Sequence, residues 1–292
     1  MPFASKKNLV KRLAHFAAQL FRKRFQRLGN LYPKGFCDDA RTSMGKSLCH
    51  RPRRDFTIDR MVSIHFFLAD HIAQDVPRGP FNSSKEWLSA SLLFHQNDCE
   101  RILSTSDDEE DLEDAERTAR IIRKLSSHML SVIPPTAQGS PETTALLHDD
   151  LSLQNILVDK DGNLTAVVDW ECVSALPLWR VCQFPHMLEG KERKEIPEKE
   201  NYAREENGSY DQLFWDRLME FEQTVLRGVF LDEMQNIELY WVEMFWNVSS
   251  QRKTDFELAV QLCSDEFSIK VLEEWLDELP KLGETRLRNR LV

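Results

Sequence analysis

Apolar residues recur at helical spacing along most of the chain, and the first such segment runs from Lys6 to Leu28. Its apolar positions lie three or four residues apart, so a helix would carry them on one side. They are Leu9, Val10, Leu13, Phe16, Ala17, Leu20, Phe21, Phe25 and Leu28. The pattern predicts a helix with one buried face and one basic, solvated face. A mitochondrial targeting helix and a membrane-surface helix stay open, because the segment is amphipathic, basic and free of acids.

Further helices are predicted downstream. Ser83 and Glu86 have the spacing of a capping box, which starts a helix by satisfying backbone N–H groups. The acidic run 107–116 fits a solvated helix start, since the N-terminus of a helix favours negative charge, and this helix ends near Pro134; a cation site is the alternative. The C-terminal helical part covers 209–280. It contains a second capping pattern at Ser209 and Gln212, a helix over 233–248, and a helix over 255–279 that is broken near Ser264.

A different pattern, typical of two short strands, occurs between Leu146 and Trp170. Ile156 to Val158 is an apolar run, and Leu164 to Val168 is a second one. Asp161 and Gly162 lie between them and predict a tight turn, because glycine accepts positive φ without steric cost. Met61 to Leu68 is also apolar enough for a short strand or a buried extended piece. The overall prediction is therefore a mainly α fold with a small β-hairpin.

Polar side chains of particular types flank this hairpin. Asp150 and Asn155 precede it, and Asp169 stands at the end of the second strand. Carboxylate and amide oxygens are ligands that suit Mg²⁺. The alternative is a set of turn-capping residues that only stabilises the hairpin.

The same stretch resembles a known family. H-x-D-x-x-x-x-N followed by a hairpin and a strand-terminal Asp is the kinase catalytic-loop arrangement. The wording HDDLSLQNILVD with VVDWECVSALPLW resembles the fungal-type branch of the aminoglycoside phosphotransferase and choline-kinase-like families. The segments FAAQLFRKRFQRLGNLY and RGPFNSSKEWL resemble the same branch. One departure is Asp149, which stands where those families usually carry Gly.

The resemblance implies a protein-kinase-like fold and a single aminoglycoside-phosphotransferase-like domain over 1–292, with the catalytic loop at 146–170. In phosphoryl transfer such proteins mostly position groups and neutralise developing charge. By this resemblance Asp150 would accept or orient the proton of a small-molecule hydroxyl substrate. Asn155 and Asp169 would hold Mg²⁺ that bridges the ATP phosphates, and His148 would fix the loop.

Other parts expected of a kinase-like enzyme are not found in the sequence. There is no G-x-G-x-x-G loop and no strand-borne Lys in a V-A-x-K run. The resemblance therefore covers the carboxy-terminal lobe, with the amino-terminal lobe missing. Three explanations are open: a fragment of a longer phosphotransferase, a pseudokinase-type binding module, or an unrelated replacement within 29–80. We expect a phosphotransferase-family chain that is weakly active or inactive by itself, or else a non-catalytic module with a protein partner on the surface facing the missing lobe.

Composition and charge limit the remaining options. Segment 1–37 contains nine Lys or Arg residues and no Asp or Glu. The rest of the chain carries the other 29 of the 38 basic residues and all 48 acidic residues, so it is strongly acidic. An acidic body argues against nucleic-acid binding. No apolar run reaches the roughly 18 residues needed to span a membrane. The six cysteines form no C-x-x-C pair, which fits a cytoplasmic location. Gly45 to Ser47 imitates part of a phosphate-binding loop, but Ala40 replaces the required glycine, so a surface loop is expected.

Overall fold

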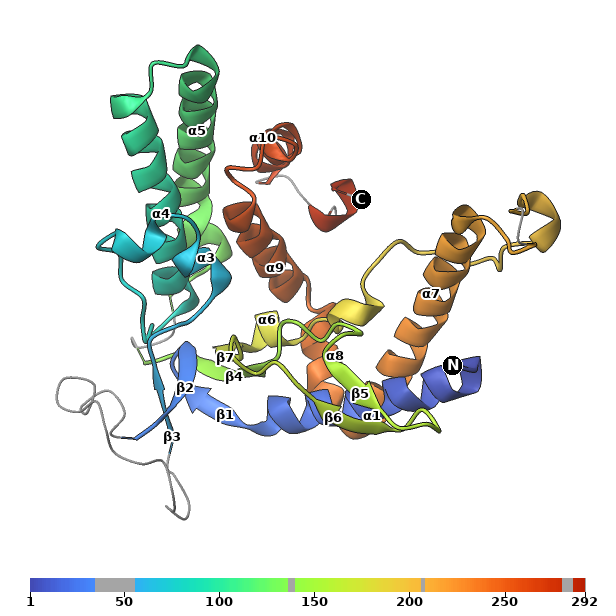
Figure 1. The fold of residues 1–292 in the computed structure, drawn as a ribbon. Coiled ribbons are helices and arrows are strands. Elements are labelled where there is room, and N and C mark those ends of the chain that lie inside the picture. Colours follow the sequence, from blue (N-terminus) through green and yellow to red (C-terminus); the bar gives the residue numbers. More distant parts are fainter. Residues whose placement is uncertain (35–55, 136–139, 206–207, 280–285, 292) are drawn as a thin grey trace, which may run out of the picture. The chain divides into compact units, whose positions relative to one another are not determined.

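The computed structural model describes residues 1–34, 56–135, 140–205, 208–279 and 286–291 (Figure 1). The chain divides into two units. The first unit comprises Met1–Arg22, His148–Trp170 and Cys182–Trp246. The second unit comprises Lys23–Leu147, Glu171–Val181 and Asn247–Val292. The expected surface loop at Gly45 to Ser47 lies outside the described residues.

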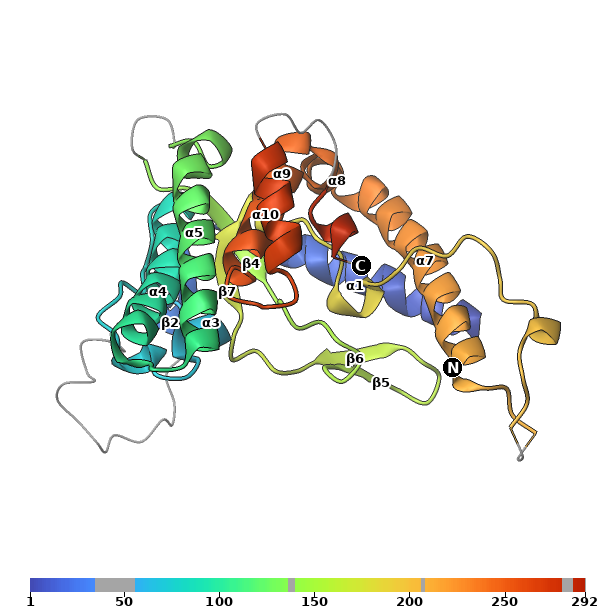
Figure 2. The same ribbon diagram turned by 90° about the horizontal axis from the view of Figure 1, so that it is seen from above.

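The first unit is built on two long helices, α1 (Phe3–Arg22) and α7 (Gln212–Ile237), which pack together (Figures 1 and 2). Its other elements are the strands β5 (Ile156–Val158) and β6 (Leu164–Val167), the short helices η3 (His186–Leu188) and η4 (Lys199–Asn201), and α8 (Leu239–Trp246). β5 and β6 pair antiparallel, which confirms the predicted hairpin.

The apolar stripe of α1 is buried, as the core-facing interpretation predicted. Leu9, Val10, Leu13 and Phe21 are each at most 3% exposed. Three side chains of the helix face acids on α7: Lys6 binds Glu222, and both Lys11 and His15 approach Glu233, with His15 Nε2 at 2.9 Å. The predicted end at Leu28 was wrong. The helix ends at Arg22, and Arg24–Gln26 forms the strand β1 instead.

The second unit contains a five-stranded antiparallel sheet that the sequence did not predict. Its order is β1 (Arg24–Gln26), β4 (Thr143–Leu147), β7 (Ser174–Pro177), β2 (Gly29–Pro33) and β3 (Phe56–Asp59). Each strand has only three to five residues, and Arg24 pairs with Ala145. Strands this short leave little periodic pattern, and their pairing is set by contacts distant in sequence.

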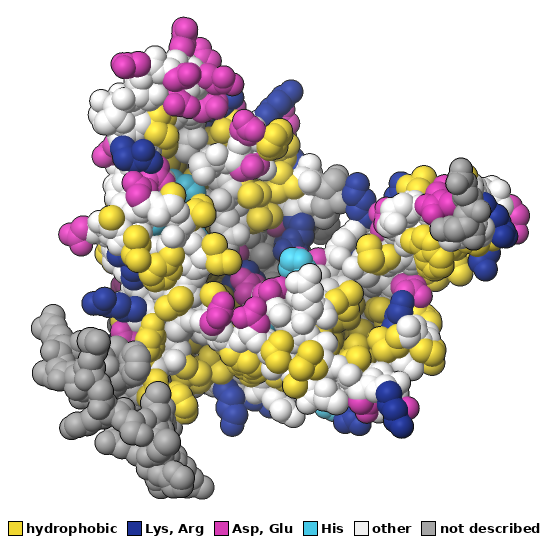
Figure 3. All heavy atoms as spheres, viewed as in Figure 1, with side chains coloured by type: hydrophobic (Ala, Val, Ile, Leu, Met, Phe, Trp, Pro, Cys, Tyr) yellow, Lys and Arg dark blue, Asp and Glu magenta, His cyan; other side chains and the backbone are white. Residues whose placement is uncertain are grey.

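The helices of this unit are α3 (Ile64–Phe67), η1 (His71–Ala73), α4 (Ser84–Thr105), α5 (Glu109–Val132), α6 (Leu178–Val181), α9 (Val248–Gln261), α10 (Ile269–Glu278) and η5 (Arg288–Arg290). α4 and α5 lie side by side in both ribbon views (Figures 1 and 2). Acidic side chains gather where α5 begins (Figure 3), and Asp108 caps this helix by accepting from Glu110 N at 2.9 Å. The run 107–116 is therefore a helix start, as predicted.

Other local predictions had mixed outcomes. Ser83 caps α4 by accepting from Glu86 N at 3.3 Å, while the Glu86 carboxylate accepts from Asn82 N rather than from the capping residue. The second cap was wrong, because Asp211 and not Ser209 caps α7. The predicted strand or buried extended piece at Met61 to Leu68 was also wrong, since it contains the helix α3. The predicted break near Ser264 falls between α9 and α10 and is confirmed.

A buried carboxylate on α9 anchors the last described segment. Asp255 is 2% exposed and accepts from Arg286 Nε at 2.7 Å, from Arg286 Nη2 at 3.0 Å and from Leu287 N at 3.0 Å. Removing a buried charge from such a pair leaves its partner uncompensated. This contact is therefore expected to contribute far more to stability than an exposed ion pair.

We expect Asp255→Asn to lower the free energy of unfolding by about 2 kcal/mol or more, measured by urea denaturation. The matched control is Asp277→Asn. Asp277 binds Lys124 at 2.6 Å but is 66% exposed, so its loss should change stability by less than about 0.5 kcal/mol. Equal effects of the two substitutions would contradict the anchoring role of Asp255.

Candidate functional site

The candidate site is the loop and hairpin from His148 to Trp170, all within the first unit. The hairpin is closed by the pairs Ile156 with Val167 and Leu157 with Ala166. Gly162 has φ +82° in the turn, as the predicted turn requires. The Asp159 carboxylate accepts from the backbone N–H groups of Asp161 and Asn163, both at 2.9 Å. Hydrogen bonds from the Asn163 side chain and backbone lower the pKa of Asp159.

The hairpin packs against apolar residues of α1. Ile156 is buried against Leu9 and Leu13 of α1, and Leu164 and Met187 cover the edge of this cluster. A backbone hydrogen bond from Met187 N to the Leu151 oxygen, 3.0 Å, ties the loop to η3. The predicted buried face of α1 therefore holds the strand that follows Asn155.

Asp150 and Asn155 are in direct contact. Asn155 Nδ2 donates to the Asp150 backbone oxygen at 2.9 Å and to its Oδ2 atom at 2.7 Å. Asn155 is 8% exposed, whereas the Asp150 side chain is exposed. Because the amide nitrogen is engaged by Asp150, Oδ1 is the Asn155 atom that could coordinate a cation. Both bonds stabilise the loop, and the second one also orients the Asp150 carboxylate.

Asp169 is joined to this pair through the backbone. Val168 N donates to the Asn155 oxygen at 3.0 Å, so Asp169 follows directly after the residue paired with Asn155. Asp169 has φ +65°, in the left-handed region that residues other than glycine seldom occupy. Strained backbone of this kind clusters at functional sites. The exposed carboxylate thus stands at the end of β6, as the sequence predicted.

His148 ties the start of the loop to the backbone just before Asp169. Its Nε2 atom donates to the Val168 oxygen at 2.8 Å, and the ring is 3% exposed. The imidazole also packs edge-on against Trp170, with ring centroids 5.3 Å apart. This agrees with the structural role expected for His148.

Trp170 and Phe16 belong to the site although sequence reasoning did not select them. Trp170 Nε1 donates to the Val167 oxygen at 2.8 Å, and its ring meets Phe16 of α1 edge-on at 5.8 Å. Asp169 therefore lies between two anchored neighbours, Val168 and Trp170. The only sequence feature that could have pointed to Trp170 is its position directly after Asp169. Phe16 gave no signal beyond the apolar stripe of its helix.

The site offers few ligands for a bare metal ion. Within the described residues, no group of three or more His, Cys, Asp or Glu side chains could hold a metal. Asp169 and the Asn155 amide oxygen would supply two oxygen ligands. Hard cations such as Mg²⁺ commonly complete such partial sites with water and substrate phosphates.

Several apolar side chains of the same loop and hairpin are exposed. The hairpin and the residues beside it expose Leu153 (67%), Leu157 (47%), Val158 (42%), Val168 (36%) and Trp170 (45%). Exposed apolar patches of this kind mark ligand-binding grooves or protein interfaces. We call these five residues the hairpin surface.

The backbone of Asp169 yields a testable order of stabilities. Alanine in the left-handed region is strained, so Asp169→Ala should unfold about 1 kcal/mol more easily than Asp169→Gly in chemical denaturation. The order should reverse or vanish at Asp161, which has no positive φ. A higher stability of Asp169→Ala than of Asp169→Gly would show that Asp169 is not held in this conformation.

Comparison with known proteins bears on the identity of this region. No curated protein and no solved structure matches the chain. Among the described residues, no helix is long and apolar enough to cross a membrane. Residues 59–179, less than half of the 292, match the model of the phosphotransferase enzyme family (APH). The match includes His148, Asp150, Asn155 and Asp169, and it supports a kinase-like transferase of the APH family with a protein-kinase-like fold.

Proposed function

We propose that the His148–Trp170 loop performs ATP- and Mg²⁺-dependent transfer of a phosphoryl group to the hydroxyl of a small molecule. Asp150 is the base that accepts or orients the proton of the acceptor hydroxyl. Asn155 and Asp169 hold Mg²⁺ against the ATP phosphates. The observation that carries this proposal is the double hydrogen bond from Asn155 to Asp150, together with the backbone pair that sets Asp169 beside Asn155.

The physical reason is the arrangement of charge. Phosphoryl transfer needs positioned groups and a cation that neutralises developing negative charge. Two carboxylates and one amide oxygen at neighbouring positions attract a divalent cation, and the Asn155 amide fixes the orientation of Asp150.

We further propose that the 292-residue chain binds nucleotide weakly and is weakly active or inactive by itself. A glycine-rich loop over the phosphates and a nucleotide-binding Lys contribute much of the affinity in kinase-like enzymes. The sequence contains no G-x-G-x-x-G. The exposed hairpin surface would then cover only one side of a bound nucleotide.

The affinity can be measured by calorimetry with Mg·ATP. We expect a dissociation constant in the millimolar range or weaker, at most about 4 kcal/mol of binding free energy. A micromolar constant would refute the weak-binding part of the proposal. Any phosphoryl transfer that is detected to aminoglycosides, amino alcohols or sugars should fall about 100-fold or more in Asp150→Asn.

The cation site can be tested without any activity. Mn²⁺ with ATP, used as a paramagnetic substitute for Mg²⁺, should broaden the NMR signals of the Asn155 side-chain amide and of the backbone amides around Asp169. Asp169→Asn should abolish the broadening, and Asp161→Asn at the hairpin tip should retain it. Broadening centred on Asp159 and Asp161 would contradict the proposed cation site and would favour the turn-capping interpretation of Asp150, Asn155 and Asp169.

A second candidate function is a pseudokinase-type module that binds a protein without catalysis. The exposed hairpin surface favours it, because apolar patches of this kind also form protein interfaces. Leu157→Ser together with Val158→Ser should then weaken association with a partner and leave Mn²⁺ broadening unchanged. Size-exclusion chromatography can follow this chain both in cell extract and after purification. If the chain elutes as a monomer in both cases, this second function is excluded.

A further inference from the structure

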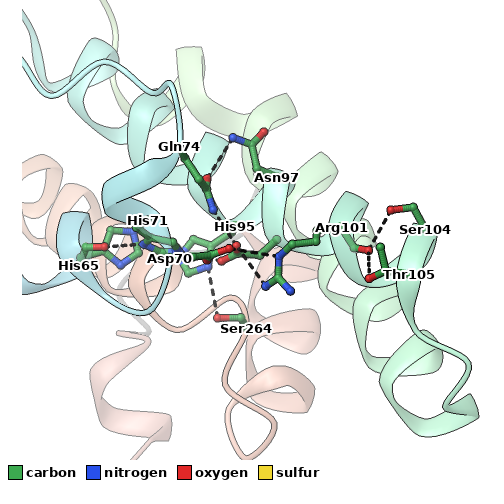
Figure 4. A network of polar contacts seen from close by, with 11 residues as sticks. His65, Asp70, His71, Gln74, His95, Asn97, Arg101, Ser104, Thr105 and Ser264 are labelled. Atoms are coloured by element: carbon green, nitrogen blue, oxygen red, sulfur yellow. Dashed lines mark hydrogen bonds and ion pairs between the residues drawn. The ribbon is translucent and has the colours of Figure 1, made fainter.

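Three histidines meet in the second unit, away from the candidate site in sequence and unused by its chemistry. His65 and His71 come from α3 and η1, and His95 comes from α4 (Figure 4). The His65 ring lies 4.8 Å from the His95 ring and 5.6 Å from the His71 ring, measured between centroids. We call these three residues the histidine cluster.

His71 is fully engaged in hydrogen bonds. Its Nδ1 atom lies 2.7 Å from the His65 backbone oxygen and therefore donates to it. Its Nε2 atom lies 2.7 Å from Asp98 Oδ2, and Gln74 Nε2 donates to Asp98 Oδ1 at 2.8 Å. The Asp98 carboxylate is thus already shared between His71 and its neighbours.

His65 and His95 are different, because the Nε2 atoms of both are buried and make no hydrogen bond with the described residues. His95 is 6% exposed, and its Nδ1 atom lies 3.2 Å from Ser264 Oγ. A proton added to either Nε2 atom would be a buried donor without an acceptor, which is costly.

Among the described residues, the carboxylates around the cluster already have other partners. Titratable and charged side chains that face it are Asp70 and Arg78 from the α3–η1 segment, Asp98, Cys99 and Arg101 from α4, and Cys263 beside Ser264 after α9. Arg101 approaches both Asp70 (3.4 Å) and Asp98 (3.7 Å). Both carboxylates therefore already have a partner in Arg101, and Asp98 also contacts His71.

We propose that His65 and His95 act as a proton-sensitive latch: they hold the segment that contains α3 and η1 against α4 while both rings are neutral, and acidification opens the contact. The energetic basis is direct. Asp98 is already shared by His71, Gln74 and Arg101, so a proton on His65 or His95 would place a buried positive charge beside a carboxylate that has other partners.

The directions of the pKa shifts agree with this geometry. Burial, with a smaller contribution from the neighbouring His65, lowers the pKa of His95 from its ordinary value to about 4, and Asp98 offsets part of this shift. Burial likewise lowers the pKa of His65, an effect partly offset by the backbone of Ser91. Because these pKa values are lower in the closed state than in the open state, the closed state loses stability as the pH falls from about 6.5 towards 4.

Opening would uncover apolar side chains. Phe94 is fully buried, stacks on His71 with centroids 4.6 Å apart, and packs against Phe66, which is 1% exposed. Arg78 also lies over the Phe94 ring, 5.4 Å from its centroid. The latch thus controls whether an aromatic core beneath the α3–η1 segment is covered.

Hydrogen exchange of the full chain at pH 7 and pH 5, corrected for intrinsic exchange rates, tests the latch. The opening equilibrium of residues 61–78 should rise about 20-fold from His95 alone. Carboxylates titrate mostly below this window, so histidines dominate the response. His95→Gln should remove most of the rise, and His128→Gln on α5 should leave it unchanged.

An NMR titration of the wild-type imidazoles provides a second measurement that requires no variant to fold. His65 and His95 should titrate well below 6.5. If His95→Gln does not fold, His65→Gln takes its place in the exchange experiment. Equal protection of 61–78 at both pH values, an unchanged rise in the variants, or ordinary titration of both rings would each overturn the proposal.

Discussion

The candidate site depends on one residue, Asn155, which bonds in two directions. Its side chain holds the Asp150 carboxylate and backbone oxygen, and its own backbone oxygen accepts from Val168. These bonds join the loop before the hairpin to the end of the hairpin, so Asn155 links Asp150 to the residue that precedes Asp169. Without this closure Asp169 would be set only by its own backbone, whose φ of +65° is unfavourable for an aspartate in isolation.

The closure requires a rigid base, and α1 supplies it. Leu9 and Leu13 bury Ile156 on one side of the helix, and Phe16 contacts Trp170. The ion pairs of α1 with α7 orient the helix but contribute modestly, because Lys11 and His15 are about half exposed. Apolar burial therefore stabilises this unit and determines which face of α1 turns inward. Two of the basic residues that made the helix resemble a targeting segment, Lys6 and Lys11, meet Glu222 and Glu233.

The parts predictable from sequence were those encoded within a few residues. The Asp161–Gly162 turn and the helix start in the acidic run 107–116 are local, and both have the predicted conformation. The contact between Asp150 and Asn155 is local as well, but the structure and not the sequence revealed it. The sheet was missed because its strands pair across long separations. Phe25 and Leu28 fit the stripe of α1, yet Phe25 pairs with Thr144 in β1 and β4. The same limit hid Phe16, whose contact with Trp170 no local pattern encodes.

The hairpin surface and the carboxylates beside it impose opposite demands on any ligand. A ligand that covers Leu157, Val158 and Trp170 gains free energy by burying apolar area. A ligand that covers Asp150 and Asp169 with apolar groups loses free energy, because it removes two charges from water without a partner. A protein partner must therefore bring cations to this place or leave the acids open. A nucleotide with Mg²⁺ satisfies both demands in one molecule, since its base is flat and largely apolar on its faces and its phosphates carry the metal. This complementarity favours the phosphotransferase function over the binding module. It is also consistent with low affinity, because a single apolar face buries only part of such a ligand.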